Sequence, residues 1–172
     1  HEIRKPSGRY VVENFDQENV DLILERLQCV FGVHTLSVAY KVNADMDTIY
    51  KTAKLVAPRR GTFKVETNRA DKKFPLNSMQ INAAIGGHLL SDNKSLQVDV
   101  HNPDIVVNIE VRDYAAYIRA GQLHGAGGLP VGTAGKAAIL ISGGIDSPVA
   151  AYTMAKRGLL LDAIHFASPP YT

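Results

Sequence analysis

The sequence predicts an α/β protein, and three observations carry this prediction. Segments whose apolar residues recur every three or four positions, which is typical of helices, alternate with segments whose apolar residues recur at every second position, which is typical of strands. A continuous apolar run over 137–142 leads through a glycine-rich turn into a helical pattern, as expected of a strand buried in a parallel sheet. The composition, with 45% hydrophobic and 21% charged residues among 172, is that of a folded globular chain.

The first 43 residues predict part of a ferredoxin-like unit. Two short strands flank the turn Pro6-Ser7-Gly8, and they are followed by a helix that Gly32 is expected to end. Alternating apolar residues predict a strand over 33–42, with Leu36, Val38, Tyr40 and Val42 on one side. The order strand, strand, helix, strand corresponds to a ferredoxin-like unit without its first strand and first helix.

Residues 44–120 predict a second compact α/β domain. A helix over 45–57 ends before Pro58, because the residue before a proline disfavours helical geometry. A strand covers 61–69, and three alternating strands fill 95–120.

A second helix of this domain covers 76–92, and either Asn77 or Ser78 could cap it. One side of the helix is expected to be apolar, through Met79, Ile81, Ala84, Ile85 and Leu89. The pair Gly86-Gly87 costs helix stability. Close helix packing, which we favour, or close approach of the helix backbone to RNA would explain it.

Residues 121–136 contain six glycines and no acid, so they predict either a flexible linker or a functional loop. The strand over 137–142 is followed by a helix over 147–157 and by another strand from residue 159. This order predicts the first βαβ unit of a doubly wound parallel sheet.

The turn Ser142-Gly143-Gly144-Ile145-Asp146-Ser147 is a candidate anion site, because unpaired N–H groups and the helix dipole favour negative charge at the start of a helix. The two glycines let the backbone approach a phosphate and permit positive φ. Ser142 and Ser147 add hydroxyl donors. Asp146 either faces the ligand and holds a bridging Mg²⁺, or caps the helix, as Ser147 also could. A Walker sequence G-x-x-x-x-G-K-[ST] is absent.

The motif S-G-G-x-D-S after an apolar strand resembles the signature of the PP-loop ATP pyrophosphatases. With its neighbours, "GAGGLPVGTAGKAAILISGGIDSPVAAYTMAKRG" and "HFASPPYT", it resembles the tRNA 4-thiouridine sulfurtransferases, and "FKVETNRADKKFP" resembles their THUMP domain. The resemblance implies the end of a ferredoxin-like domain over 1–43, a THUMP RNA-binding domain over 44–120 (from near residue 18 in a longer definition), a Gly-rich linker over 121–136 and the start of a PP-loop domain over 137–172.

This resemblance implies ATP-dependent sulfur transfer to a tRNA uridine through an adenylated uridine, with ATP and Mg²⁺ as cofactors. Asp146 is the implied catalytic residue and possible Mg²⁺ ligand. The implied nucleotide-binding residues are Ile139, Leu140, Ser142, Gly143, Gly144, Asp146, Ser147, His165 and Phe166. For His165 and Phe166, packing in the core is the alternative role.

RNA binding is expected in the second domain. Residues 51–73 hold eight basic residues and two acids, for a local net charge of +6 (eight minus two), which suits phosphate contacts. Four residues match the THUMP pattern R-x-x-K-x-F-P or lie within it, namely Arg69, Lys72, Lys73 and Phe74.

The sole cysteine, Cys29, excludes an internal disulfide and is expected to be buried on the apolar side of its helix. A reducing cytoplasm is the expected location, since the chain has a single cysteine and its first residues lack an apolar signal core. No apolar run is long enough for a membrane span. The implied partners are tRNA, a cysteine desulfurase as sulfur donor and the sulfur carrier protein of thiamine synthesis; the oligomeric state stays open, with a homodimer among the alternatives.

The chain is expected to be a fragment, because one βαβ unit does not complete a doubly wound sheet. The resemblance implies a catalytic cysteine outside these 172 residues, which alone are expected to be inactive. Two other functions stay open: a tRNA-binding module without catalysis, and a PP-loop enzyme that adenylates another substrate.

Overall fold

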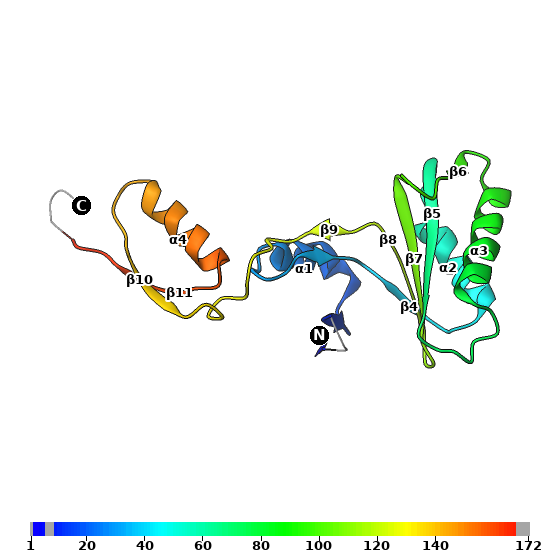
Figure 1. Ribbon diagram of the computed structural model, residues 1–172, viewed down its shortest axis with the longest axis horizontal. Helices are drawn as coiled ribbons and strands as arrows, with labels where there is room; N and C mark the ends of the chain where they lie inside the picture. Colours follow the sequence, from blue (N-terminus) through cyan, green and yellow to red (C-terminus); the bar gives the residue numbers. More distant parts are fainter. Residues whose placement is uncertain (1, 6–8, 168–172) are drawn as a thin grey trace. The chain divides into compact units, whose positions relative to one another are not determined.

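The computed structural model describes residues 2–5 and 9–167. The chain folds into two compact units (Figure 1). The central unit comprises Ser37–Gln122, and the terminal unit comprises His1–Leu36 together with Leu123–Thr172. The mixed α/β class predicted from the sequence is confirmed.

The central unit is a five-stranded sheet with two helices on one face (Figure 1). The strand order is β4-β8-β7-β5-β6, in which β5 runs parallel to β6 and β7, and β8 runs antiparallel to β7 and β4. The elements are β4 (Tyr40–Val42), α2 (Met46–Val56), β5 (Gly61–Arg69), α3 (Ser78–Asp92), β6 (Leu96–Val98), β7 (Ile105–Val111) and β8 (Ala116–Ala120).

The core of the central unit lies between α3 and the sheet. Alternate residues of β5 and β7 are buried, as the period of a strand requires, and they belong to one apolar cluster with three residues spaced four apart on α3: Ile81, Ile85 and Leu89. The prediction that Met79 shares this face is wrong, because Met79 is 80% exposed. Two residues of helix rotate about 200°, so Met79 lies nearly opposite Ile81.

Both helices of the central unit begin at a side-chain cap. Asp45 accepts a hydrogen bond of 2.8 Å from the amide of Thr48 at the start of α2. Asn77 and Gln80 form a reciprocal capping box at the start of α3, with two bonds of 2.9 Å. Of the two candidates for this cap, Asn77 is the correct one.

The single strand expected over 33–42 is two strands in two different sheets. β3 (Thr35–Leu36) pairs with β9 (Leu123–His124) in the terminal unit, whereas β4 pairs with β8 in the central unit. The alternation of apolar residues is the same in both pieces, so it could not reveal where the partner changes.

The helix of the N-terminal segment, α1 (Val20–Gln28), ends before the expected Gly32. Gly32 has a φ of 92°, and its amide donates to the carbonyl of Gly127 over 2.8 Å. A Cβ at this position would lie 2.8 Å from Cγ of Pro130. Gly32 therefore permits a close approach between two segments and is not a helix stop.

Cys29 follows the end of α1 and is exposed, so the prediction that it is buried is wrong.

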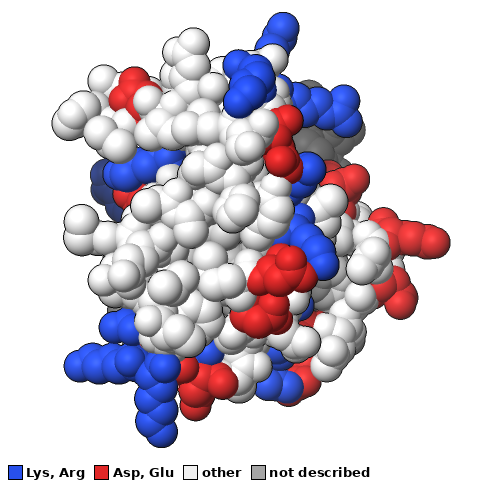
Figure 2. All heavy atoms as spheres, turned by 90° about the vertical axis from the view of Figure 1, so that its right-hand side faces the viewer, with Lys and Arg blue, Asp and Glu red and all other residues white. Residues whose placement is uncertain are grey.

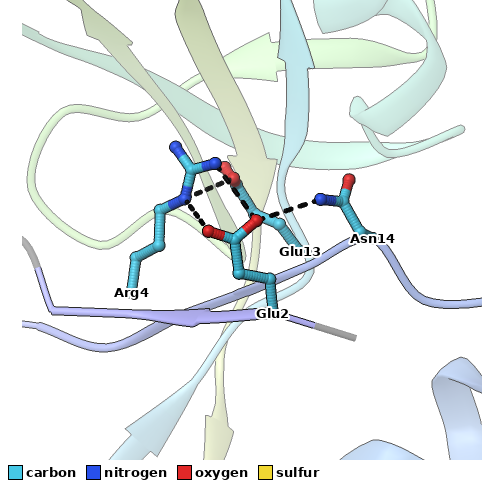
Figure 3. A network of polar contacts seen from close by, with 4 residues as sticks. All are labelled: Glu2, Arg4, Glu13 and Asn14. Atoms are coloured by element: carbon cyan, nitrogen blue, oxygen red, sulfur yellow. Dashed lines mark hydrogen bonds and ion pairs between the residues drawn. The ribbon is translucent and has the colours of Figure 1, made fainter.

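β1 (Glu2–Arg4) and β2 (Val11–Glu13) form the expected antiparallel pair; the turn Pro6-Ser7-Gly8 lies outside the described residues. Glu2 and Glu13 stand directly opposite each other, which is unfavourable for two carboxylates. Arg4 lies between them, with its Nε 2.9 Å from Glu2 and 3.5 Å from Glu13 (Figure 3). Asn14 donates to Glu2 over 3.2 Å.

The expected βαβ unit is present in the terminal unit. β10 (Lys136–Leu140) runs parallel to β11 (Leu160–Ile164), and α4 (Asp146–Lys156) connects them. The phosphate-loop candidate therefore joins a strand to a helix, as predicted. Among the described residues, no helix has the length and apolar character that crossing a membrane requires.

Candidate functional site

The loop between β10 and α4 is open to solvent at the start of a helix. The amide of Ile141 still donates to the carbonyl of Ile164 over 2.8 Å, so the parallel pairing ends there. Residues 142–146 are exposed. The N-cap residue of α4 is Ile145, and no side chain of the described residues caps the helix. The N–H groups of the first turn are thus left available to an anion.

The two serines of the loop face each other and hold its ends together. The hydroxyl of Ser147 accepts from the amide of Ser142 over 3.2 Å, and the two hydroxyl oxygens are 3.4 Å apart. The amide of Gly144 lies 3.4 Å from the hydroxyl of Ser142. Ser147 therefore closes the loop instead of capping α4.

Gly143 and Gly144 contribute their small size and do not adopt a left-handed backbone conformation. Neither has a positive φ, so that part of the expectation is wrong. A Cβ on Gly143 would meet nothing within 4 Å. The glycines therefore leave open space above the loop, as close approach of a phosphate requires.

Asp146 is the first residue of α4, and its carboxylate is exposed. Since no side chain makes a capping hydrogen bond, the alternative that Asp146 caps the helix is wrong. A carboxylate in the first turn is favoured by the helix dipole, and it remains accessible to a cation that bridges it to a phosphate.

The carboxyl ends of β10 and β11 bring the other expected nucleotide-binding residues to one edge. Ile139 and Leu140 pair in register with Ala163 and Ile164. Nδ1 of His165 lies 2.9 Å from the carbonyl of Ile141, directly before the loop. Phe166 is 74% exposed, so its alternative role in the core is not seen within the described residues.

The glycine-rich segment is built against the end of α4 and is not a free linker. The amide of Leu129 donates to the carbonyl of Lys156 over 2.9 Å, and the amides of Gly132 and Ala134 donate to the carbonyl of Gly158. A Cβ on Gly128 would lie 2.2 Å from the carbonyl oxygen of Lys156. Of the two alternatives for this segment, the flexible linker is wrong.

The same segment also contacts the stretch after α1, which sequence analysis did not anticipate. The amide of Gly127 donates to the carbonyl of Val33 over 2.8 Å, and a Cβ on Gly125 would lie 2.3 Å from that carbonyl oxygen. The ring of Phe31 meets Tyr152 of α4 edge to face, with centroids 5.0 Å apart. The only feature of the sequence that indicated such contacts was the number of glycines, and this number does not indicate which segments they contact.

In the central unit, Arg69 and Phe74 shape the loop after β5. Nη1 of Arg69 lies 3.1 Å from the carbonyl of Phe74 and 3.4 Å from those of Lys72 and Leu76. Phe74 is only 8% exposed. Lys72 and Lys73, in contrast, are exposed.

The basic residues expected to form one cluster lie in several places. Lys51, Lys54 and Lys64 form ion pairs with Asp47, Asp92 and Glu66. Arg59 and Arg60 precede β5, whereas Lys72 and Lys73 follow it. A nine-residue strand rises about 3.3 Å per residue, so the two basic pairs are on the order of 30 Å apart.

A broad uncharged area lies between charged groups on the side that carries α2 and α3 (Figure 2). α3 contributes to it, because 78–91 contain no charged residue. Gly86 is buried and Gly87 is exposed, but among the described residues a Cβ at either position would meet nothing within 4 Å, so packing does not require glycine there. Close approach of the backbone to RNA stays a prediction.

α2 and α3 are linked by a polar cluster that sequence analysis also missed. The hydroxyl of Tyr50 and the ammonium of Lys54 both donate to the carboxylate of Asp92. His88 packs against the ring of Tyr50, with centroids 4.6 Å apart. The hydrogen bond from Lys54, and then that from Tyr50, lowers the pKa of Asp92.

Two family models match the chain. The THUMP domain matches residues 43–119, and the thiamine biosynthesis protein (ThiI) model matches residues 132–172. A probable tRNA sulfurtransferase of Thermoanaerobacter pseudethanolicus is 47% identical over 172 residues, which are 99% of this chain and 44% of that protein. Its counterpart from Bacillus licheniformis is 48% identical over 159 residues, which are 90% of this chain and 40% of that protein.

Solved structures agree. The crystal structure of a 4-thiouridine synthetase–RNA complex with bound ATP is 36% identical, with a TM-score of 0.86 over 98% of this chain and 45% of that chain. A crystal structure from Pyrococcus horikoshii is 30% identical, with a TM-score of 0.84 over 98% of this chain and 56% of that one. The chain thus spans less than half the length of the curated relatives named above. Matched along nearly all of its own length, it belongs to the tRNA sulfurtransferase family, in which it comprises the THUMP domain and the beginning of the ThiI domain.

Proposed function

We propose that this chain takes part in the ATP-dependent transfer of sulfur to a uridine of tRNA. The observation that carries the proposal is the open loop 142–147 at an uncapped helix start, in a chain that also holds a THUMP domain. The curated relatives are probable tRNA sulfurtransferases, and the 4-thiouridine synthetase of known structure was crystallised with RNA and ATP.

The loop suits the pyrophosphate part of ATP. The first-turn amides of α4 and the Ser142 and Ser147 hydroxyls are donors, and a Cβ on Gly143 would meet nothing within 4 Å. A bare carboxylate would repel phosphate, so Asp146 would instead hold a Mg²⁺, the hard cation that carboxylates and phosphates share, and this ion would neutralise the charge of the pyrophosphate. The backbone of Ile139 and Leu140 meets the nucleotide, and His165 and Phe166 flank the adenine, at the carboxyl ends of the two strands.

ATP supplies the leaving group that the uridine lacks. The carbonyl oxygen of the uridine attacks the α-phosphorus of ATP, and pyrophosphate leaves. The outer sulfur of a persulfide then attacks the adenylated carbon and displaces AMP, and a thiol breaks the sulfur–sulfur bond, which leaves 4-thiouridine and a disulfide. The role of the chain's own residues is to hold the pyrophosphate and neutralise its charge as it departs. A cysteine desulfurase provides the sulfur, and a sulfur carrier protein of thiamine synthesis is a further proposed partner.

The central unit provides the RNA contacts in this proposal. Lys72 and Lys73 are exposed beside a fixed loop, and side chains of this kind bind phosphates without reading sequence. Arg69 and Phe74 belong to the same loop, with one donating inward and the other buried.

Asp146→Ala in the complete gene product tests the proposal. We expect tRNA-dependent release of pyrophosphate from ATP to fall by about 10²-fold or more, as when charge stabilisation is removed from a transition state, while affinity for tRNA stays near that of the wild type. Asp162→Ala, which removes a carboxylate from β11, is the matched control. Tight tRNA binding without any pyrophosphate release would instead identify an RNA-binding module, and release that ignores tRNA would identify another adenylating enzyme.

A further inference from the structure

We infer that Arg69 is a positioning residue, which fixes the loop 70–76 so that Lys72 and Lys73 are presented to RNA phosphates and which does not itself bind RNA. This inference rests on the proposed binding of tRNA by the central unit. It reverses the simplest interpretation of the motif, in which every cation of the loop contacts phosphate.

The hydrogen bonds of Arg69 point into its own loop. Its Nη1 lies 3.1 Å from the carbonyl of Phe74 and 3.4 Å from the carbonyls of Lys72 and Leu76. A terminal guanidinium nitrogen carries two hydrogens, so three acceptors occupy all that it can donate. This nitrogen is therefore committed to the backbone that carries the two lysines.

Other contacts hold the same loop from both sides. The amides of Ala70 and Asp71 both donate to the carbonyl of Val111, over 2.9 and 3.3 Å. The carboxylate of Asp71 accepts from the amide of Lys73 over 2.8 Å. Phe74 is buried in the core cluster of the central unit. The backbone of the lysine pair is thus anchored before, within and after the pair.

The lysine side chains differ from the other lysines of the basic stretch. Lys51, Lys54 and Lys64 each form an ion pair with an acid. For Lys72 and Lys73 no such pair is found in the described part of the chain, and both are exposed. A fixed backbone with two available ammonium groups lowers the entropy lost on binding a phosphate.

A salt series on the 172-residue chain, with an unmodified tRNA transcript as probe, tests the inference. The double variant Lys72→Ala/Lys73→Ala should reduce the slope of log affinity against log salt by about 1.4 to 1.8, as expected for two lost phosphate contacts. Arg69→Lys keeps the charge but replaces the planar guanidinium by a shorter side chain with a single nitrogen, which does not reproduce the geometry of the three contacts. We expect Arg69→Lys to reduce the affinity for tRNA nearly as much as the lysine double variant does. The triple variant, which combines all three substitutions, should lose no more affinity than the lysine double variant.

Two results would overturn the inference. Arg69→Lys binding as tightly as the wild type would show that only the charge matters. The second result concerns the triple variant. If its fold-loss of tRNA affinity equals the product of the losses from Arg69→Lys and from the lysine double variant, then Arg69 contacts RNA independently. Lys51→Ala, which removes a paired lysine from α2, controls for the loss of one positive charge.

Asp71→Ala provides a test in which charge and positioning predict opposite signs. Removing an acid beside two lysines should strengthen RNA binding if charge alone decides. Because the substitution also removes the bond to the Lys73 amide, we expect weaker binding instead; tighter binding would contradict the inference.

Trypsin cleavage separates a failed inference from a failed function, and from unfolding. In Arg69→Lys we expect faster cleavage at Lys72 and Lys73, while the melting temperature and the other cleavage sites change little. Unchanged cleavage at these lysines would show that Arg69 does not order the loop. If the wild-type chain does not bind tRNA, the proposed function is wrong. If it binds tRNA but substitution of Arg69 does not change that binding, only the inference is wrong.

Discussion

At the scale of single residues, glycines determine the structure of the segment before the loop 142–147. Gly128 has a φ of 76°, and a Cβ there would lie 2.2 Å from the Lys156 carbonyl oxygen, whereas Gly132 has a φ of 90° and open space. Gly132→Ala should cost about 1–2 kcal/mol for the left-handed backbone. Gly128→Ala should cost clearly more, because the helix end must also move. Urea unfolding of both variants measures the difference, and equal losses would mean that the contact with Lys156 is relieved without cost.

The cap of α3 gives a second prediction at this scale. Asn77 accepts from the amide of Gln80, whereas Ser78 is already the first residue of the helix. Asn77→Ala should lower the free energy of unfolding by about 1 kcal/mol. Ser78→Ala should stay within about 0.5 kcal/mol, as is usual for surface sites. Thermal unfolding of the two variants checks this, and a larger loss for Ser78→Ala would contradict the assignment of the cap.

At the scale of elements, Asp92 joins α3 to α2 through Lys54 and Tyr50. Its pKa is lowered from 3.8, first by the hydrogen bond from Lys54 and then by that from Tyr50. A carboxyl whose folded pKa is lowered stabilises the protein above its unfolded pKa, and this contribution is lost as the pH falls through the folded pKa. Asp92→Asn should therefore lower the melting temperature at pH 7 and flatten its fall below about pH 4.

Asp47→Asn is the control for the prediction on Asp92. It changes the net charge equally but breaks only a pair within α2, between Asp47 and Lys51. The melting temperatures of the wild type and of Asp92→Asn are compared as the pH falls. If the wild type loses no more than the variant, the cluster does not stabilise the contact between the helices.

At the scale of the whole molecule, the terminal unit leaves apolar side chains in water around the loop 142–147. One helix covers one face of the two-stranded sheet, and large apolar residues stay exposed, among them Leu140, Ile145, Val149 and Phe166. A surface of this kind is typical of a site that associates with another surface. We expect the 172-residue chain to self-associate in sedimentation and to bind ATP with Mg²⁺ weakly in calorimetry. A stable monomer with micromolar affinity for ATP would contradict both expectations.

The sequence by itself determined the kinds of element, the parallel βαβ unit with its glycine-rich loop 142–147, and the family. These depend on local patterns, each of which lies within a short stretch of sequence. Examples are the apolar period of α3 and β5, the cap at Asn77 and the motif at 142–147. Only the tertiary structure decided that residues 33–42 divide between two sheets, that Gly32 and Gly128 permit close contacts, that Cys29 is exposed and that Arg69 turns inward. Each of these depends on a partner distant in the sequence or on the course of a loop, and the local pattern is the same whichever partner is present.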